Sequence, residues 1–316
     1  NIDKLTYASS EESLSEISNS SNYKFINGDI CDKEFILKLI FDFKPNVLMH
    51  LAAESHVDRS IDSPFEFISE NILSTLNLLS NTLDFYNKNK NKIKNFEFVY
   101  IGTDEIYGDL EKTKNKFSEK SLISPNNPYS SSKASCYHLV NAFNKTYKLP
   151  VKRINFCNNF GEFQFPEKLI PKTILSIINR KPVHLYGNGL QIRNWIYATD
   201  TSKKLYNVIN YKKKKSVFNI SSNLELNNLE LIKIIHKLIN KVSKKNYPLK
   251  LKYVVDRPGH DQRYSLIDNT FEKTTKYTKK DFSNRLAKVI RWYLNNDNLS
   301  YFNNANIIFN RIGLQK

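Results

Sequence analysis

The segment Phe96-Glu-Phe-Val-Tyr-Ile-Gly-Thr-Asp-Glu-Ile-Tyr-Gly108 decides the fold class, because a short apolar run in it ends directly in polar residues. Residues 96–101 have the length and the aromatic and β-branched content of a buried strand. Thr103, Asp104 and Glu105 follow at once. In open α/β sheets, ligands bind beyond the carboxyl ends of the strands. The segment therefore predicts a strand with a candidate site at its end, although an N-cap role for Thr103 or Asp104 is an alternative.

Short strands alternate with longer helical patterns along the first half of the chain, as in βαβ units with a parallel sheet. The predicted strands are residues 23–26, 46–51, 96–101 and 151–156, and the predicted helices are 34–43, 65–86 and 130–147. Beyond residue 161 we predict helices over 167–179, 200–210 and 229–241 and strands over 183–186 and 217–220. We expect an α/β fold with a first domain over residues 1–160. A smaller α/β lobe follows over 161–294, with some return to the first domain, and then a loosely ordered tail over 295–316.

The composition is that of a globular protein, and it excludes several other classes. Of 316 residues, 40% are hydrophobic and 25% charged, which argues against collagen-like, mucin-like and wholly disordered chains. We expect a soluble protein, because no apolar run approaches the roughly 20 residues of a membrane span and no signal-peptide pattern is present. Cys31, Cys136 and Cys157 lack the number and spacing of a disulfide framework or a zinc site, so we expect a reducing cytoplasm and no metal.

The net charge of +17 allows two interpretations. The lysines are spread through Lys- and Asn-rich stretches such as residues 87–95 and 212–215, which favours a compositional drift of the surface loops. A basic surface for nucleic acid is the alternative. No stacking-aromatic motif supports it, and we expect no specific nucleic-acid partner.

The string Tyr129-Ser-Ser-Ser-Lys133 opens a predicted helix, and its spacing places Tyr129 and Lys133 on one face. A tyrosine that acts as a base near neutral pH needs a pKa about 3 units below its reference value of about 10, and a neighbouring ammonium supplies part of that shift. The same spacing also arises by chance on a surface. The other strand ends give the context, because Met49-His-Leu-Ala-Ala-Glu-Ser-His56 also follows a strand with small residues that let a flat cofactor approach.

Longer strings resemble the extended short-chain dehydrogenase/reductases, in the NAD-dependent epimerase/dehydratase family, and above all their nucleotide-sugar 4,6-dehydratases. They are DKLTY at residues 3–7, DIC at 29–31, HLAAESHVDRS at 50–60, TDEIYGD at 103–109, YSSSK at 129–133, FPEKLIP at 165–171 and DRPGHD at 256–261. The resemblance implies a Rossmann-like doubly wound parallel sheet, bound NAD and dTDP-glucose as the substrate. It also implies a homodimer in which the helices over 65–86 and 130–147 pair with their mates.

By this resemblance, the reaction begins with oxidation at C4 of the hexose. Tyr129 takes the hydroxyl proton, hydride passes to NAD, and Lys133 holds the ribose and lowers the pKa of Tyr129. Glu105 then removes the C5 proton while Asp104 protonates the departing C6 hydroxyl. Hydride return to C6 gives dTDP-4-keto-6-deoxyglucose, and Thr103 hydrogen-bonds the C4 oxygen throughout.

The resemblance also assigns binding residues. The cofactor residues are Asp3, Lys4, Leu5, Thr6, Asp29, Ile30, Leu51, Ala52, Ala53, Glu54, Ser55, Tyr129, Lys133 and Asn159. The substrate residues are Ser55, Thr103, Asn158, Lys168, Leu169, Tyr186, Arg193, Asn228, Arg257 and His260. A carboxylate at the position of Asp3 binds the adenosine ribose hydroxyls and favours NAD over NADP, and arginines suit a diphosphate.

The chain departs from the family pattern in several places, and two of them concern the cofactor. Relatives begin with a strand, a glycine-rich turn and a helix around the NAD pyrophosphate, whereas none of the eight glycines here forms GxGxxG. We interpret the sequence as a fragment of an intact enzyme, and as it stands we expect it to fold poorly, to bind NAD weakly and to expose two strand edges. Glu70 replaces a threonine beside the cofactor, and its added carboxylate, expected near the nicotinamide side, either weakens cofactor binding or points to solvent.

Two other functions stay open. A sibling dehydratase or epimerase that acts on another nucleotide or hexose shares the same motifs. An inactive relic that serves as a basic interaction or RNA-binding protein is the alternative from a different class, and it predicts steeply salt-dependent binding.

Overall fold

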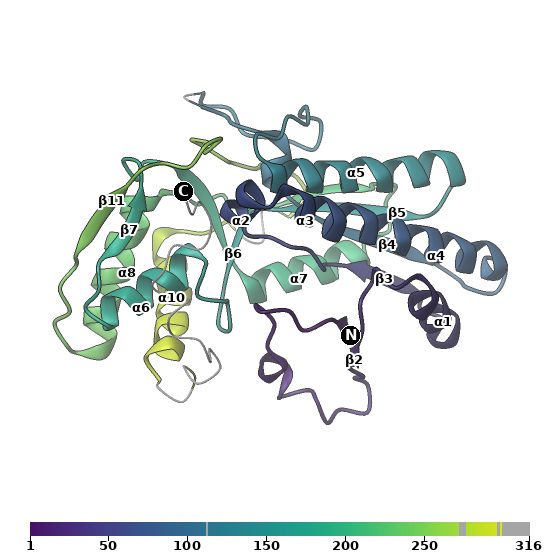
Figure 1. Cartoon of the computed structure of the whole chain (residues 1–316), viewed down its shortest axis with the longest axis horizontal. Coiled ribbons are helices and arrows are strands. Elements are labelled where there is room, and N and C mark those ends of the chain that lie inside the picture. The colour runs from purple at the N-terminus through teal and green to yellow at the C-terminus, as the bar shows by residue number, and fades with distance from the viewer. Residues whose placement is uncertain (112, 272–275, 296–297, 299–316) are drawn as a thin grey trace. The chain divides into compact units, whose positions relative to one another are not determined.

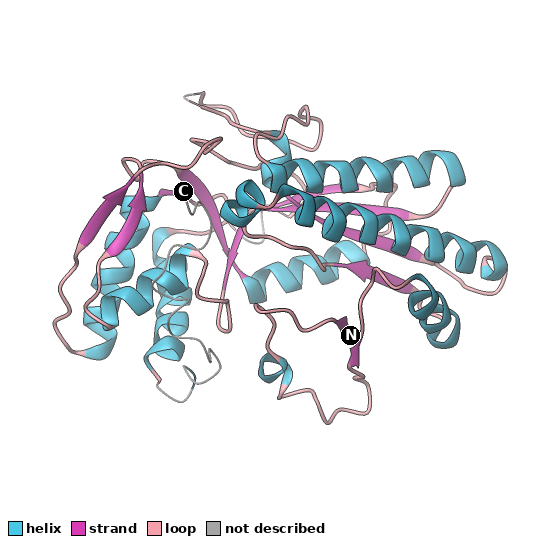
Figure 2. Cartoon of the chain, viewed as in Figure 1, coloured by secondary structure: helices cyan, strands magenta, loops and turns pink. Residues whose placement is uncertain are grey.

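The computed structural model describes residues 1–111, 113–271, 276–295 and 298, and it is drawn in Figures 1 and 2. The chain divides into two compact units. Unit 1 consists of Asn1–Ile106, Asn127–Asn155 and Lys212–Phe218, and unit 2 consists of Tyr107–Asn126, Phe156–Tyr211 and Asn219–Lys316. The predicted tail over 295–316 lies almost entirely outside the described residues. Among the helices of the described residues, none has the length and apolar character needed to cross a membrane.

The main sheet contains four strands in the order β3-β4-β5-β9, and a strand was predicted at the place of each one. Its strands are β3 (Val47–His50), β4 (Glu97–Thr103), β5 (Val151–Phe156) and β9 (Val217–Ile220). β3 runs parallel to β4, with Val47 opposite Glu97 and His50 opposite Tyr100. β4 is buried along almost its whole length. Such a continuous apolar run is typical of a parallel strand that is covered on both faces.

A second, two-stranded sheet of unit 1 pairs β1 (Ile2–Asp3) with β2 (Ile26–Asn27) in parallel. Within the described residues, β1 and β3 each stand at the end of their sheet. The 3-10 turn η1 (Glu11–Leu14) lies between β1 and β2, and helix α1 (Lys33–Phe43) follows β2. The side chain of Asp32 caps α1 by accepting a 3.0 Å hydrogen bond from the backbone N–H of Phe35.

The remaining helices of unit 1 include the long helix that opens with the Tyr/Lys string. They are α2 (Val57–Asp62), α3 (Pro64–Ile68), the π-turn η2 (Ser69–Leu73), α4 (Ser74–Asn89) and α5 (Pro128–Tyr147). α5 packs against β4, α2, α3 and α4. The single helix predicted over 65–86 is wrong in one respect, because the π-turn interrupts it. Such turns are frequent at functional sites, and η2 carries Glu70.

Unit 2 is built from short strands and amphipathic helices. β6 (Asn158–Phe160), β8 (Ile192–Tyr197) and β10 (Glu225–Asn227) form one sheet in the order β10-β8-β6, and β7 (Val183–Tyr186) pairs in parallel with β11 (Leu251–Val254). The helices are α6 (Leu169–Ile178), α7 (Ala198–Ile209), α8 (Asn228–Ser243) and α10 (Lys279–Leu294). α8 packs against both α6 and α10, and its buried Leu231, Ile235 and Ile239 follow helical spacing.

Candidate active site

The end of β4 carries three polar side chains at the carboxyl end of a parallel strand. Thr103 and Asp104 are 8% and 1% exposed, and Glu105 is half-buried. Thr103 Oγ1 lies 3.3 Å from Asp104 Oδ1, to which it donates, and it accepts a 3.3 Å hydrogen bond from the backbone N–H of Glu105. The short turn η3 (Asp104–Tyr107) starts there. The capping role considered from the sequence is therefore found for Thr103, and its hydroxyl also contacts the Asp104 carboxylate.

Tyr129 and Lys133 lie one turn apart in the first turns of α5, as predicted. The helix begins there because the Asn127 side chain accepts a 2.9 Å hydrogen bond from the backbone N–H of Ser130, while Pro128 occupies the first turn. Both side chains are buried. The sequence around residues 127–130 thus fixes where the helix begins and therefore the position of the Tyr129 side chain in its first turn.

The Tyr129 side chain meets the end of β4 within unit 1. Its pKa is raised, first by burial and then by the charges of Glu105 and Asp104, while a hydrogen bond with Thr103 acts in the opposite direction. The strand end and the helix start therefore form one cluster, as predicted. The direction of the pKa shift is opposite to that expected for a tyrosine base.

Lys133 directs its ammonium to the sheet. Its Nζ donates a 2.8 Å hydrogen bond to the carbonyl oxygen of Ile101 and lies 4.8 Å from the ring centroid of Tyr100. This placement explains why the lowering of the Tyr129 pKa that we expected from Lys133 is not found. Burial lowers the pKa of Lys133 to about 8, so its charge responds to pH near neutrality.

A cavity of about 750 Å³ lies in unit 1 beside β1 and β3. Its lining includes nine predicted cofactor residues, namely Asp3, Lys4, Thr6, Asp29, Ile30, Leu51, Ala52, Ala53 and Glu54. Much of the remaining wall is apolar and comes from α1 and β3. Mostly apolar pockets of this size with a few polar groups are typical of cofactor sites. Carboxylates for sugar hydroxyls and an apolar wall for a base fit a nucleotide.

The turn after β1 holds Asp3 in place at the cavity. Asp3 Oδ1 accepts hydrogen bonds from the backbone N–H of Leu5 at 2.7 Å and from Ser9 Oγ at 3.0 Å. Leu5 has a φ of +53°, in the left-handed region that costs energy for a leucine. The Asp3 carboxylate therefore stabilises an unusual turn at the strand end, as expected for a residue that must be oriented toward a ligand.

Four predicted substrate residues come together in unit 2. The rings of Tyr186 and His260 lie 6.1 Å apart, nearly perpendicular, and His260 Nδ1 lies 2.5 Å from Asp256 Oδ1. The pKa of His260 is lowered to about 4, first by burial and then by the charges of Arg257 and Arg193. Two guanidinium groups near a neutral imidazole are suited to binding an anion such as a phosphate.

The other predicted residues of unit 2 are more scattered. Asn228 Nδ2 donates to Gln191 Oε1 at 3.3 Å, and Gln191 Nε2 donates to Asp256 Oδ2 at 3.0 Å, so Asn228 is linked to the arginine–histidine cluster. On separate elements lie Asn158 and Asn159, in β6, and Lys168 and Leu169, at the start of α6. Ser55, a predicted residue of both sites, belongs to unit 1.

Two residues that contact the predicted groups were missed from the sequence. The buried Tyr100 lies against the Lys133 ammonium, and its hydroxyl donates a 3.1 Å hydrogen bond to the Lys133 carbonyl oxygen. Its place inside an apolar strand gave no signal beyond that of a core residue. The second missed residue, Asp256, orients His260. Gly187, whose φ is +54°, lies so close that a Cβ there would come within 2.7 Å of Asp256 Oδ2. The DRPGHD string was the available signal for Asp256.

Comparison with known proteins agrees with this geometry. The family model described as GDP-mannose 4,6 dehydratase matches residues 1–285. A dTDP-glucose 4,6-dehydratase of Shigella flexneri is 40% identical over 310 residues, which cover 94% of this chain and 86% of that protein.

Two solved structures show the same fold. One is DesIV, a dTDP-glucose 4,6-dehydratase from Streptomyces venezuelae with NAD bound, which gives a TM-score of 0.82 at 32% identity. The match covers 93% of this chain and 87% of the DesIV chain. The dTDP-glucose 4,6-dehydratase of Bacillus anthracis in complex with NAD gives 0.78 at 33% identity, with 94% and 88% covered. The predicted Rossmann-like α/β fold is thereby confirmed. The chain belongs to the GDP-mannose 4,6 dehydratase family, and the relatives it matches at this level are dTDP-glucose 4,6-dehydratases.

Proposed function

We propose that this protein is an NAD-dependent lyase that dehydrates dTDP-glucose to dTDP-4-keto-6-deoxyglucose. The observation that carries the proposal is the cluster of Thr103, Asp104, Glu105 and Tyr129, where two carboxylates and a hydroxyl at the end of β4 meet a tyrosine of α5. A tyrosine supports oxidation of an alcohol, and a carboxylate pair supports removal of water.

We propose that the cavity of unit 1 holds the adenosine part of NAD. When bound, NAD would accept hydride from C4 of the sugar and return it to C6, while Glu105 would return a proton to C5. Asp3 would hold the adenosine ribose through its hydroxyls, and the apolar wall would cover the adenine. Lys133 would turn from the Ile101 carbonyl toward the nicotinamide ribose, where its positive charge would favour the tyrosinate form of Tyr129.

The oxidation step would use Tyr129 and Thr103. The tyrosinate oxygen of Tyr129 would take the proton from the C4 hydroxyl as that carbon loses hydride, and it would become a neutral hydroxyl. Thr103 lies within hydrogen-bonding range of the Tyr129 hydroxyl and would donate to the same C4 oxygen. The resulting C4 ketone makes the C5 proton more acidic, which prepares the next step.

The elimination step would use the two carboxyl groups of η3. Glu105, the more exposed of the two, is assigned as the base that removes the C5 proton. Asp104, which is 1% exposed and accepts a hydrogen bond from Thr103, is assigned by the family resemblance as the acid that protonates the departing C6 hydroxyl.

We propose a matching division of labour between the two units. Unit 1 holds the proposed NAD and reaction groups, and unit 2 would bind the nucleotide sugar. In unit 2, Arg193 and Arg257 would bind the diphosphate, and His260, whose pKa both charges lower, would serve as a neutral hydrogen-bonding partner. Asn159, Lys168 and Asn228 keep their proposed contacts with the nicotinamide or the sugar.

A product assay tests the proposed function. The purified protein is incubated with NAD and, in separate reactions, dTDP-glucose, UDP-glucose and GDP-mannose, and the products are identified by mass spectrometry and NMR. We expect the loss of one water from dTDP-glucose and a 6-deoxy-4-keto product. Conversion of another sugar nucleotide with dTDP-glucose left unchanged would move the assignment to a sibling dehydratase, and a C4 epimer would move it to an epimerase.

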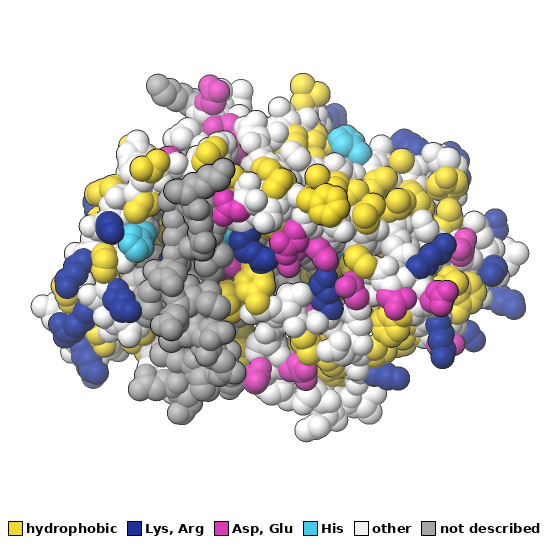
Figure 3. Space-filling model, viewed as in Figure 1, with side chains coloured by type: hydrophobic (Ala, Val, Ile, Leu, Met, Phe, Trp, Pro, Cys, Tyr) yellow, Lys and Arg dark blue, Asp and Glu magenta, His cyan; other side chains and the backbone are white. Residues whose placement is uncertain are grey.

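We also propose a homodimer. Large hydrophobic side chains are exposed along α3, η2 and α4, among them Phe65, Leu73 and Leu76 at 82%, 56% and 38% exposed. Figure 3 shows hydrophobic side chains gathered over the region of these helices and α5. Pairing with a second copy would cover this face. A Leu73→Glu/Leu76→Glu variant should therefore sediment as a monomer, and an unchanged sedimentation coefficient would contradict the dimer.

A reducing compartment, the cytoplasm, is the proposed location. Cys31, Cys136 and Cys157 are free thiols, and free cysteines in this number are ordinary in reducing compartments. Localisation of the tagged protein by fractionation tests this assignment.

A further inference from the structure

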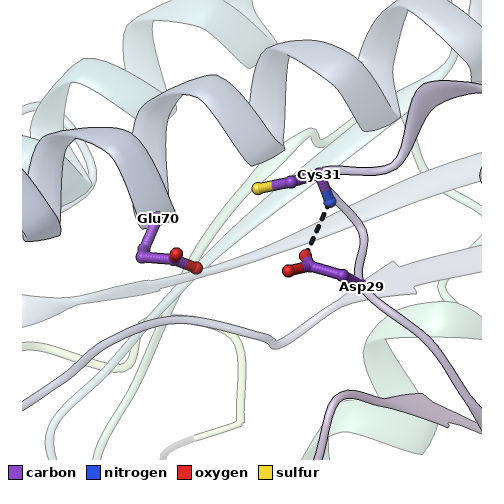
Figure 4. A group of neighbouring side chains, drawn as sticks. All are labelled: Asp29, Cys31 and Glu70. Atoms are coloured by element: carbon purple, nitrogen blue, oxygen red, sulfur yellow. Dashed lines mark hydrogen bonds between the residues drawn. The ribbon is translucent and has the colours of Figure 1, made fainter.

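Three polar side chains converge at the edge of the cavity in unit 1. Figure 4 shows Glu70 reaching in from its helical segment toward Asp29 and Cys31 on the loop after β2. One oxygen or sulfur atom of each lies within 4.8 Å of the others. The Lys4 ammonium pairs with Glu70 Oε2 and lies 3.3 Å from Asp29 Oδ2. Because this ammonium already supplies a cation, we interpret the cluster through its charge and not as a metal site.

The cluster carries one net negative charge. Burial, and then the charges of Asp29 and Glu70, raise the pKa of Cys31 to about 11, so the thiol stays neutral at physiological pH. Although burial opposes it, pairing with Glu70 and Asp29 raises the pKa of Lys4, which therefore keeps its proton. Two carboxylates thus face one ammonium. Lys4, Asp29 and Glu70 all line the cavity, and their side chains are 31%, 41% and 32% exposed.

The position of Lys4 relates this charge balance to the choice between NAD and NADP. Lys4 directly follows Asp3 at the end of β1. In dinucleotide sites, a carboxylate near this position contacts the ribose 2′-hydroxyl of NAD, whereas a nearby cation accommodates the 2′-phosphate of NADP. Lys4 is such a cation by sequence. In the structure, however, Glu70, which lies 66 residues further along the chain, holds its ammonium.

We propose that Glu70 determines cofactor specificity. By pairing with Lys4, it keeps the ammonium from binding a 2′-phosphate, and its own charge repels that dianion, so the protein selects NAD over NADP more strongly than Asp3 alone achieves. The inference rests on the proposed function, since it takes this cavity as the adenosine site. It also means that Glu70 neither points away to solvent nor simply spoils cofactor binding.

The test is to measure the dissociation constants of NADH and NADPH for the purified full chain by calorimetry at low and physiological ionic strength. Glu70→Gln removes the charge and keeps the shape. We expect it to bind NADPH about five- to tenfold more tightly, as one partly exposed contact with a dianion allows, with NADH affinity changed less than twofold. Adding Lys4→Met to Glu70→Gln should abolish most of the gain, because the freed ammonium is what binds the phosphate.

Glu66→Gln is the matched control. It removes the same charge one helical turn earlier, where Glu66 pairs with Arg59 at 3.0 Å and does not line the cavity, so its ratio of NADPH to NADH affinity should equal that of the wild type. If Glu70→Gln fails to fold, Glu70→Thr serves instead. An unchanged affinity ratio in a folded Glu70 variant would overturn the inference while leaving the proposed function intact. Binding of neither nucleotide by the wild type would overturn both.

Discussion

Replacing Lys133 with methionine should change how protein stability depends on pH. The Lys133 pKa falls from 10.5 to about 8 in the folded protein because the ammonium is buried. Since the unfolded chain then holds the proton more tightly than the folded one, Lys133 destabilises the fold below about pH 8, and this penalty fades as the pH rises toward 10.5.

The size of the effect follows from the shift. One pKa unit corresponds to about 1.36 kcal/mol, so a drop from 10.5 to about 8 gives a penalty of about 3 kcal/mol near pH 7 and about 1 kcal/mol near pH 10. Methionine has a similar length and no charge. The Lys133→Met variant loses the 2.8 Å hydrogen bond to Ile101, which offsets about 1 kcal/mol at every pH.

The assay is urea unfolding of the wild type and the variant at several values between about pH 7 and pH 10, with the difference in unfolding free energy plotted against pH. We expect that difference to change by about 2 kcal/mol in favour of the wild type across this range. Lys145→Met, which removes an exposed lysine of the same helix, controls for the loss of a surface charge. If the difference in unfolding free energy between wild type and Lys133→Met is the same at every pH, the pKa of Lys133 is not lowered by burial.

Three further predictions concern the proposed chemistry and the stability of unit 2. Glu105→Gln should slow the loss of water by about 10²-fold or more while C4 oxidation continues. Mass spectrometry should therefore detect the 4-keto sugar without its 6-deoxy product, and full product formation would refute the assignment of Glu105 as the base. Tyr129→Phe should slow the first hydride transfer about 10²-fold while substrate affinity, measured by calorimetry, stays unchanged. Arg263→Met should lower the unfolding free energy by about 2 kcal/mol, because Glu225 loses charge-assisted bonds of 2.9 and 3.1 Å while Lys116 and Ser265 still contact it. A loss below about 1 kcal/mol in urea unfolding would show that this pair is dispensable.

The parts of the fold with strong local signals were predictable from the sequence. β5 and β7 match the predicted ranges, and α5 begins within two residues of its prediction, because apolar runs and the Asn127–Pro128 start are local features. The strands β6, β8 and β10 were missed. β8 contains Arg193 and Asn194, which are buried and hydrogen-bonded, so its sequence lacks the alternation that marks a strand.

Helix α10 was missed for a different reason. Its buried Phe282, Leu286, Val289 and Tyr293 follow helical spacing, and Thr278 caps its start with a 3.1 Å hydrogen bond from the backbone N–H of Asp281. That pattern was present in the sequence and was overlooked.

The candidate site was predictable as a set of residues but not as an electrostatic arrangement. The strings around Thr103 and Tyr129 predicted that both lie at one site, and the structure brings them together. The direction of the Tyr129 pKa shift depends on burial and on how Asp104 and Glu105 approach, which only three-dimensional packing sets. The pairing of Lys4 with Glu70 likewise joins residues 66 positions apart, with no local signal.

The most direct test of the central claim follows one hydrogen through the reaction. dTDP-glucose carrying deuterium at C4 is incubated with the purified protein and NAD, and the product is analysed by NMR and mass spectrometry. If the proposed reaction is right, the label leaves C4 and appears at C6 of dTDP-4-keto-6-deoxyglucose, because one bound cofactor takes and returns the same hydride. Recovery of dTDP-glucose with all its deuterium at C4 would contradict it.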